Sequence, residues 1–238
     1  MSLENRVAVI TGATGGLGST LARSLAGQFA SLALLDIDPA KLETLAQSLS
    51  LPASRLFMQT VDLLDPAGTK SAAQAIHAKF GHLDILLHVV GGWTGGKTLL
   101  EAPASDLAFM LNQHVWTSFN VIQAFVPHLV ENGWGRVAMI TSPYAARPNA
   151  KGGPYAIGKA GQEALMLALS QELQGTGVTA NLLQAKTIDV KREKISAPSA
   201  DNAAWTTPEE LTAAILYLLS DAASTINGAK LPLFGSYS

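Results

Sequence analysis

Thr11-Gly-Ala-Thr-Gly-Gly-Leu-Gly18 carries most of the information about the architecture of this 238-residue chain. It follows a short apolar run and precedes a segment in which Leu17, Leu21 and Leu25 recur at helical spacing. Glycines between a strand and a helix let the backbone turn tightly and approach a phosphate, while the helix N-terminus offers free N–H groups. An ordinary glycine-rich turn explains the glycines alone equally well.

Apolar runs and helical patterns alternate from this turn to the end of the chain. The alternation predicts parallel βαβ units with helices on both faces of a sheet. We therefore expect an α/β fold: a single Rossmann-type doubly wound domain over residues 1–238, with about seven parallel strands. The irregular region at about 186–206 is the expected substrate loop. The predicted strands are 6–11, 31–36, 56–63, 83–90, 136–141, 178–184 and 230–234, and the predicted helices are 16–28, 39–49, 66–81, 104–131, 154–174 and 207–220. Asp38-Pro39, Asp65-Pro66 and a capping box at Thr207-Pro-Glu-Glu210 predict the starts of three of these helices.

The composition excludes several classes of protein. Only 14% of the residues are charged, and the net charge of −2 gives no electrostatic footprint for nucleic acid or an anionic membrane. The absence of cysteine excludes disulfides and thiolate chemistry. No apolar run is long enough to span a bilayer, and the N-terminus lacks the apolar core of a signal peptide. We expect a cytoplasmic protein that acts on a small molecule, with no nucleic-acid or membrane partner. The five histidines show no ligand spacing, so we predict no catalytic metal.

Two acidic residues at predicted strand ends indicate a dinucleotide. Asp36 lies eighteen residues after Gly18, close to the ~20-residue offset of an acid that binds the adenosine ribose hydroxyls. A carboxylate there would repel the extra phosphate of NADP, which favours NAD. Asp62 ends the third predicted strand, where it could accept a hydrogen bond from the adenine amino group. A turn aspartate is the alternative interpretation of Asp62.

A second motif, Gly153-Pro-Tyr-Ala-Ile-Gly-Lys159, lies in the middle of the chain. Pro154 suits the first position of a helix, so Tyr155 and Lys159 should share one face, roughly 6 Å apart along the axis. A cation beside a phenol is the arrangement that a tyrosine acid/base needs. Ser142 lies thirteen residues before the tyrosine, after a predicted strand. An amphipathic surface pair and a turn serine are the alternative interpretations.

The glycine motif, the terminal acid of the second strand, the serine and Tyr-x-x-x-Lys occur in this order in one chain. Together they resemble the short-chain dehydrogenase/reductase (SDR) family over nearly the whole length. The resemblance implies a seven-stranded parallel sheet and an enzyme that reduces carbonyls or oxidises alcohols with a nicotinamide cofactor. It also implies a homodimer or homotetramer in which the helices at 104–131 and 154–174 form the main interface.

The resemblance also implies the role of each matching residue. Tyr155 is the general acid/base, Lys159 lowers the pKa of the phenol and holds the nicotinamide ribose, and Ser142 binds the carbonyl oxygen. Asn112 matches the asparagine whose helix distortion holds a water in the proton relay. The expected cofactor contacts are Gly12, Thr14, Gly16, Leu17, Gly18, Asp36, Asp62, Leu63, Gly91, Tyr155, Lys159 and Ile188. The expected substrate contacts are Trp93, Ser142 and Tyr144, with Thr94, Arg147 and Trp205 in positions that could also line the pocket.

Two segments depart from the family pattern. His88-Val89-Val90-Gly91 stands where the family usually has Asn-Asn-Ala-Gly, and Ala185-Lys186 stands where it has Pro-Gly. The threonine that usually follows aligns with Val190. His88 is expected to be a structural hydrogen-bonding residue, and Lys186 either contacts pyrophosphate or projects into solvent.

Three hypotheses follow. The leading one is an NAD(H)-dependent alcohol dehydrogenase or ketone reductase. The second is the same enzyme with a preference for NADP(H). The third is a dinucleotide-binding regulator or scaffold without turnover, which the two departures favour and which an intact acid/base set opposes.

Overall fold

Seven parallel strands form one sheet in the order β3-β2-β1-β4-β5-β6-β7. The structure is a computed structural model that describes residues 3–28 and 30–234. Met1 and Ser2 begin the N-terminal stretch that lacks the apolar core of a signal peptide, and they lie outside the described residues. The strands are β1 (Val7–Thr11), β2 (Ser31–Asp36), β3 (Leu56–Thr60), β4 (Ile85–His88), β5 (Gly135–Thr141), β6 (Val178–Gln184) and β7 (Lys230–Pro232). The helices are α1 (Gly16–Gly27), α2 (Pro39–Leu49), α3 (Pro66–Phe80), α4 (Ala104–Leu111), α5 (Thr117–Glu131), α6 (Gly153–Glu172), α7 (Glu193–Ser196) and α8 (Pro208–Leu218).

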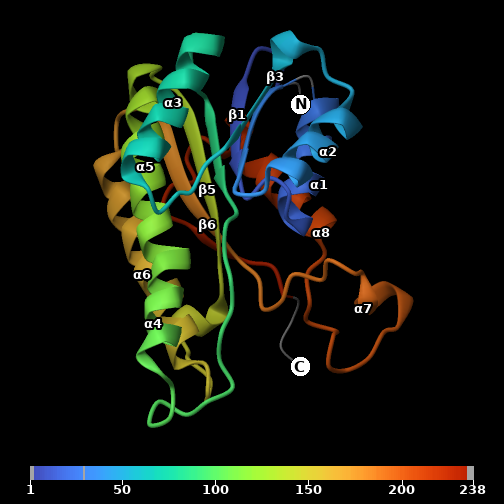
Figure 1. Cartoon of the computed structure of the whole chain (residues 1–238), viewed down its shortest axis with the longest axis vertical. Coiled ribbons are helices and arrows are strands. Elements are labelled where there is room, and N and C mark those ends of the chain that lie inside the picture. The colour runs from blue at the N-terminus through green and yellow to red at the C-terminus, as the bar shows by residue number, and fades with distance from the viewer. Residues whose placement is uncertain (1–2, 29, 235–238) are drawn as a thin grey trace.

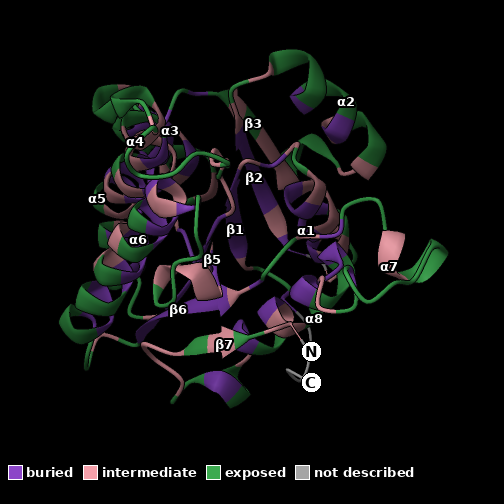
Figure 2. Cartoon of the chain, turned by 90° about the horizontal axis from the view of Figure 1, so that it is seen from below, coloured by how far each residue is buried: buried purple, intermediate pink, exposed green. Residues whose placement is uncertain are grey.

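The sheet lies between two layers of helices, as the predicted doubly wound fold requires. Figure 1 shows α3, α4, α5 and α6 along one face and α1, α2 and α8 along the other. One buried cluster packs between the sheet and the α3–α5–α6 layer, and a second packs between the sheet and the layer of α1 and α8. The central strands are buried along their whole length, which Figure 2 shows in purple for β1. The predicted fold class is confirmed.

Local sequence signals explain where several helices begin. Asp38 and Asp65 each accept a hydrogen bond from a backbone N–H of the following helix, and a proline occupies the first turn after each of them. Thr207 and Glu210 form a reciprocal capping box at the start of α8. The caps and prolines at these three positions were predicted from the sequence.

The strands β3, β4 and β7 are two to four residues shorter than predicted, and two regions differ from the prediction in kind. The helix expected over residues 104–131 is α4 and α5 joined by a π-helical turn, Asn112–Trp116, in which the Thr117 N–H donates to the Asn112 carbonyl. The region expected to be irregular contains the short helix α7. The carboxylate of Asp189 accepts hydrogen bonds from the first two N–H groups of α7, at 2.8 and 2.9 Å. In the described part of the chain, no helix is long and apolar enough to cross a membrane.

Candidate active site

The candidate site lies where the strand order reverses, between β1 and β4. Loops beyond the carboxyl ends of strands at such a switch point are where open α/β sheets bind ligands. Two cavities open here, of about 320 and 410 Å³, and they adjoin because Val89, Val90 and Gly91 line both. The predicted cofactor residues Gly12, Thr14, Asp36, Asp62, Leu63 and Gly91 line the first cavity, and Tyr155, Lys159 and Ile188 line the second.

The glycine-rich turn is shaped by two close approaches. Gly12 has a φ of +70°, which favours glycine, and the backbone of β4's following loop lies against it. A Cβ on Gly18 would lie only 2.2 Å from the Gly12 carbonyl oxygen, so the start of α1 packs directly on the turn. Leu17 points into the core, and the side chain of Val190 covers Gly16.

Two carboxylates that line the first cavity, those of Asp36 and Asp62, are held in place by hydrogen bonds. One oxygen of Asp36 accepts from the Thr14 N–H at 2.9 Å and from the Thr14 hydroxyl at 2.8 Å, and the other accepts from the Ile37 N–H at 2.8 Å. Asp62 accepts from the Leu64 N–H at 2.9 Å. Carboxylates held in this way accept hydrogen bonds and repel anions. The residues therefore fit the hydroxyl and amino groups of an adenosine.

The second cavity is lined by a tyrosine and a lysine, and a buried serine follows the neighbouring strand β5. Tyr155 and Lys159 lie one turn apart on α6, and the fully buried Ser142 follows β5. Burial raises the pKa of Tyr155 above its ordinary value, and a hydrogen bond with Ser142 opposes that rise. The sequence predicts that Lys159 lowers this pKa, but in the structure the ammonium is engaged elsewhere. It donates to the Ile140 carbonyl at 2.7 Å and to the Gln162 side chain at 2.9 Å, and burial lowers its own pKa to about 7.

His114 is a site residue that the sequence did not reveal. Its Nε2 lies 2.9 Å from the Gly92 carbonyl, which only accepts, so Nε2 carries the proton and the buried Nδ1 is left without a partner among the described residues. The ring lies edge-on to Tyr155 with centroids 5.6 Å apart. Burial, followed by the charge of Lys159, lowers the pKa of His114 to about 3, which keeps the ring neutral.

Asn112 does not reach either cavity, and its side chain makes no hydrogen bond with the described residues. The π turn changes the helical register here, so that His114, two residues further on, points into the second cavity instead. The family resemblance implies a helix distortion at Asn112, and the π turn begins at this residue. The role of Asn112 in a proton relay stays a prediction, because the side chain that the turn directs into the cavity is that of His114.

His88 has a structural position. It is fully buried at the end of β4, with its ring nitrogens 2.7 Å from the Thr11 hydroxyl and 3.4 Å from the Thr117 hydroxyl. Burial is the main cause that lowers its pKa to about 3. A neutral His88 thus ties β1, β4 and α5 together below the cavities.

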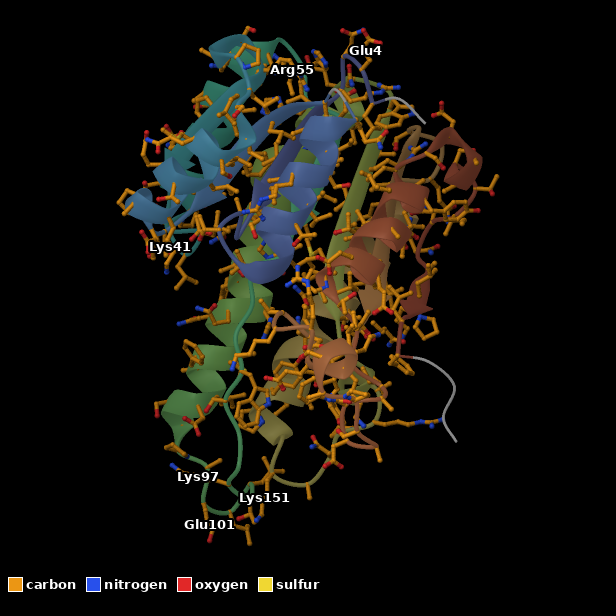
Figure 3. The ribbon with its side chains drawn as sticks, turned by 90° about the vertical axis from the view of Figure 1, so that its right-hand side faces the viewer. Glu4, Lys41, Arg55, Lys97, Glu101 and Lys151 are labelled. Carbon is orange, nitrogen blue, oxygen red and sulfur yellow. The ribbon has the colours of Figure 1, made fainter. Side chains whose placement is uncertain are left out.

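The outer wall of the second cavity includes Trp93, which is 65% exposed, and Lys186. The loop that contains Trp93 meets the segment before α6, because the Gly96 N–H donates to the Lys151 carbonyl at 2.9 Å. Figure 3 shows Lys97, Glu101 and Lys151 together at this end of the molecule. Tyr144 lies near Tyr155, whose pKa it raises, while Thr94, Arg147 and Trp205 line neither cavity. Within the described ranges, no group of three or more acidic or histidine side chains could hold a metal ion.

Comparison with known proteins places these features in a family. The family described as short chain dehydrogenase matches residues 6–198. The D-threitol dehydrogenase of Mycolicibacterium smegmatis is 28% identical over 249 residues, which cover 99% of this chain and 94% of that protein. The oxidoreductase UcpA of Escherichia coli is 31% identical over 184 residues, which cover 76% and 68%.

Solved structures share the fold. A short-chain type dehydrogenase/reductase from Mycobacterium ulcerans superimposes with a TM-score of 0.89 at 24% identity, over 98% of this chain and 90% of that chain. An NAD+-bound xylitol dehydrogenase gives 0.90 at 20% identity, over 99% and 100%. Identities this low establish the architecture alone.

Proposed function

This chain belongs to the short-chain dehydrogenase family, and from that premise we propose that it is an NAD(H)-dependent oxidoreductase that interconverts a carbonyl group and a secondary alcohol. When bound, the nicotinamide supplies or accepts the hydride. Asp36 and Asp62 would hold the adenosine end in the first cavity, and the turn from Gly12 to Gly18 would hold the pyrophosphate. The acceptor-only carboxylate of Asp36 supports NAD rather than NADP.

Tyr155 is the proposed proton donor to a carbonyl oxygen and the proposed acceptor from an alcohol. The Ser142 side chain acts on the phenol by lowering its pKa, and we propose that it binds the same substrate oxygen, which orients that oxygen and stabilises charge that develops on it. For alcohol oxidation the phenol must lose its proton, yet burial raises its pKa in the free protein. We propose that Tyr155 becomes a useful base only after the positively charged oxidised nicotinamide fills the cavity beside it.

The observation that carries this proposal is the shared cavity of Tyr155 and Lys159 beside the buried Ser142. The proton path proposed here runs through these three residues, and a relay through Asn112 remains a prediction for which the structure provides no contact.

The test is nicotinamide-dependent turnover on a panel of ketones and polyols that includes threitol and xylitol, the polyols in the names of the similar proteins. We expect Tyr155→Phe to lose at least about 100-fold in kcat. Tyr217→Phe removes a half-exposed phenol on α8 and serves as the matched control. Turnover by Tyr155→Phe at the wild-type rate would refute the mechanism, whereas NADH binding without turnover on any compound would support a dinucleotide-binding regulator.

We also propose that two or four copies associate through α4, α5 and α6. Large apolar side chains on these helices and on the π turn are exposed: Phe109, Trp116 and Ile157 are 45–53% exposed, and Leu167 is 37% exposed. Light scattering of Trp116→Glu combined with Leu167→Glu tests this, because a buried charge pair of like sign should dissociate the assembly. An unchanged mass would place the interface elsewhere.

A further inference from the structure

A buried chain of uncharged polar groups lies behind Lys159. The Lys159 ammonium donates to the side-chain oxygen of Gln162 at 2.9 Å, and the Gln162 amide nitrogen donates to the Ser118 hydroxyl at 3.0 Å. The Ser118 hydroxyl in turn donates to the His114 carbonyl at 2.6 Å. Gln162 and Ser118 are fully buried. The chain therefore links α6 to the π turn without contact with solvent.

Each hydrogen bond in this chain has one possible direction. An ammonium only donates, so the Gln162 oxygen faces Lys159 and its nitrogen faces Ser118. A carbonyl only accepts, so the Ser118 hydrogen points to the backbone and its lone pair receives the amide. Glutamine is suited to this place because its one planar group accepts on one side and donates on the other.

Two of the three N–H groups of the ammonium are used inside the protein. One donates to the Ile140 carbonyl at 2.7 Å and one to Gln162, which is the one side chain among the described residues that accepts from it. Lys159 also lines the second cavity. Because the N–H bonds of an ammonium are tetrahedral, fixing two of them sets the direction of the third.

We propose that Gln162 is a positioning residue for Lys159. Its amide, clamped by Ser118, fixes the ammonium so that the third N–H points into the cavity that contains Tyr155. The inference rests on the proposed function, since this N–H is the one that would reach the cofactor ribose. A carboxylate at position 162 would hold the ammonium more strongly, and an apolar side chain would leave it short of an acceptor.

Other charged and titratable groups surround Lys159, and they stay constant in the test. Glu163 on the same helix raises the pKa of Lys159, and its carboxylate is itself paired with Lys230 of β7 at 3.0 Å. His114 of the π turn and His88 of β4 face it as neutral rings. Tyr155 lies one turn away on α6.

The test is a pH titration of Lys159, monitored by the carbon-13 NMR signal of its Cε in protein labelled at lysine. The signal is assigned by its absence from the spectrum of Lys159→Met. Gln162→Glu should raise the midpoint by at least about one pH unit, because a carboxylate favours the ammonium. Gln162→Met has a similar length and no amide, and it should lower the midpoint, because the charged form loses an acceptor. Gln171→Glu makes the same change at an exposed position of α6 and should leave the midpoint unmoved.

Binding of NADH at pH 6, where Lys159 is charged in the wild type, gives the second readout. Gln162→Met should bind NADH on the order of tenfold more weakly, the effect of losing one hydrogen bond to a charged group. If Gln162→Met does not fold, Ser118→Ala removes the clamp instead and should shift the midpoint downward by a smaller amount.

The proposal is overturned if Gln162→Glu leaves the Lys159 midpoint at the wild-type value, or if the Glu and Met variants shift it in the same direction. Neither NMR result depends on turnover. Wild-type protein that binds NADH but turns over no compound would therefore refute the proposed enzymatic activity. The role of Gln162 would still be decided by the NMR titration alone.

Discussion

The packing of α1 on the glycine-rich turn predicts that Gly18→Ala is costly. A Cβ at this position would lie 2.2 Å from the Gly12 carbonyl oxygen and 2.8–2.9 Å from two backbone atoms of Ala13, whereas ordinary contact begins at 3.4 Å. Every one of these neighbours is backbone, so no side chain can rotate away to make room. The start of α1 must instead move from the turn.

The expected cost is that of overpacking a buried site, about 1–3 kcal/mol. For a chain of this size, 1 kcal/mol corresponds to about 2–4 °C in Tm, so we expect Gly18→Ala to unfold about 2–12 °C below wild type. NADH affinity should fall as well, because the displaced turn is the proposed pyrophosphate site.

Gly27→Ala in the same helix is the matched control. A Cβ on Gly27 meets no atom within 4 Å, and alanine is a better helix former than glycine. It should raise Tm by up to about 4 °C and leave NADH affinity unchanged. Differential scanning calorimetry at one protein concentration measures the first effect and isothermal titration the second. Gly18→Ala protein that melts at or above the wild-type Tm and binds NADH equally well would refute the packing argument.

Three further predictions follow from the charged groups. Burial lowers the pKa of Lys159 from 10.5 to about 7, so in that window the unfolded chain binds one more proton and wild-type stability rises with pH, at about 1.4 kcal/mol per unit. Lys159→Met lacks this pH dependence, so the amount by which its free energy of unfolding in urea exceeds that of wild type at pH 7 should shrink towards pH 10. A difference between the two free energies that stays constant with pH would contradict the lowered pKa. Because burial raises the pKa of Tyr155, the ultraviolet difference spectrum between wild type and Tyr155→Phe should show ionisation only above pH 10 without cofactor, and a transition near neutral pH would be incompatible with it. Asp36→Ala removes the carboxylate that repels a phosphate and should improve NADPH binding relative to NADH by on the order of tenfold. Wild-type protein that prefers NADPH would disprove the argument.

The sequence was most informative where structure is decided locally or by topology. The caps at Asp38, Asp65 and Thr207 are properties of a few adjacent residues, and all three begin helices as predicted. Asp36 and Asp62 are far apart in sequence, but parallel strands bring their carboxyl ends to one edge, so both line the same cavity.

What the sequence did not reveal depends on burial and on the direction of side chains. The spacing of Tyr155 and Lys159 places them on one helix face, but it does not show that the ammonium turns inward to Ile140 and Gln162. Without the depth of burial, the opposite shifts in the two pKa values could not be foreseen.

The π turn between α4 and α5 has a consequence for how the chain tolerates insertions and deletions. A regular α-helix rotates by about 100° per residue, so a turn that spans one extra residue sets the two helices about 100° out of phase with an uninterrupted rod. α4 packs on α6, and α5 packs on α3. The change of phase at the π turn therefore lets two successive helices contact neighbours that lie in different directions. Deleting a single residue from Asn112–Trp116 would restore the regular phase and rotate the buried face of α5, including Val121 and Phe125, away from the core. The length of this segment is therefore constrained as tightly as the identity of its residues.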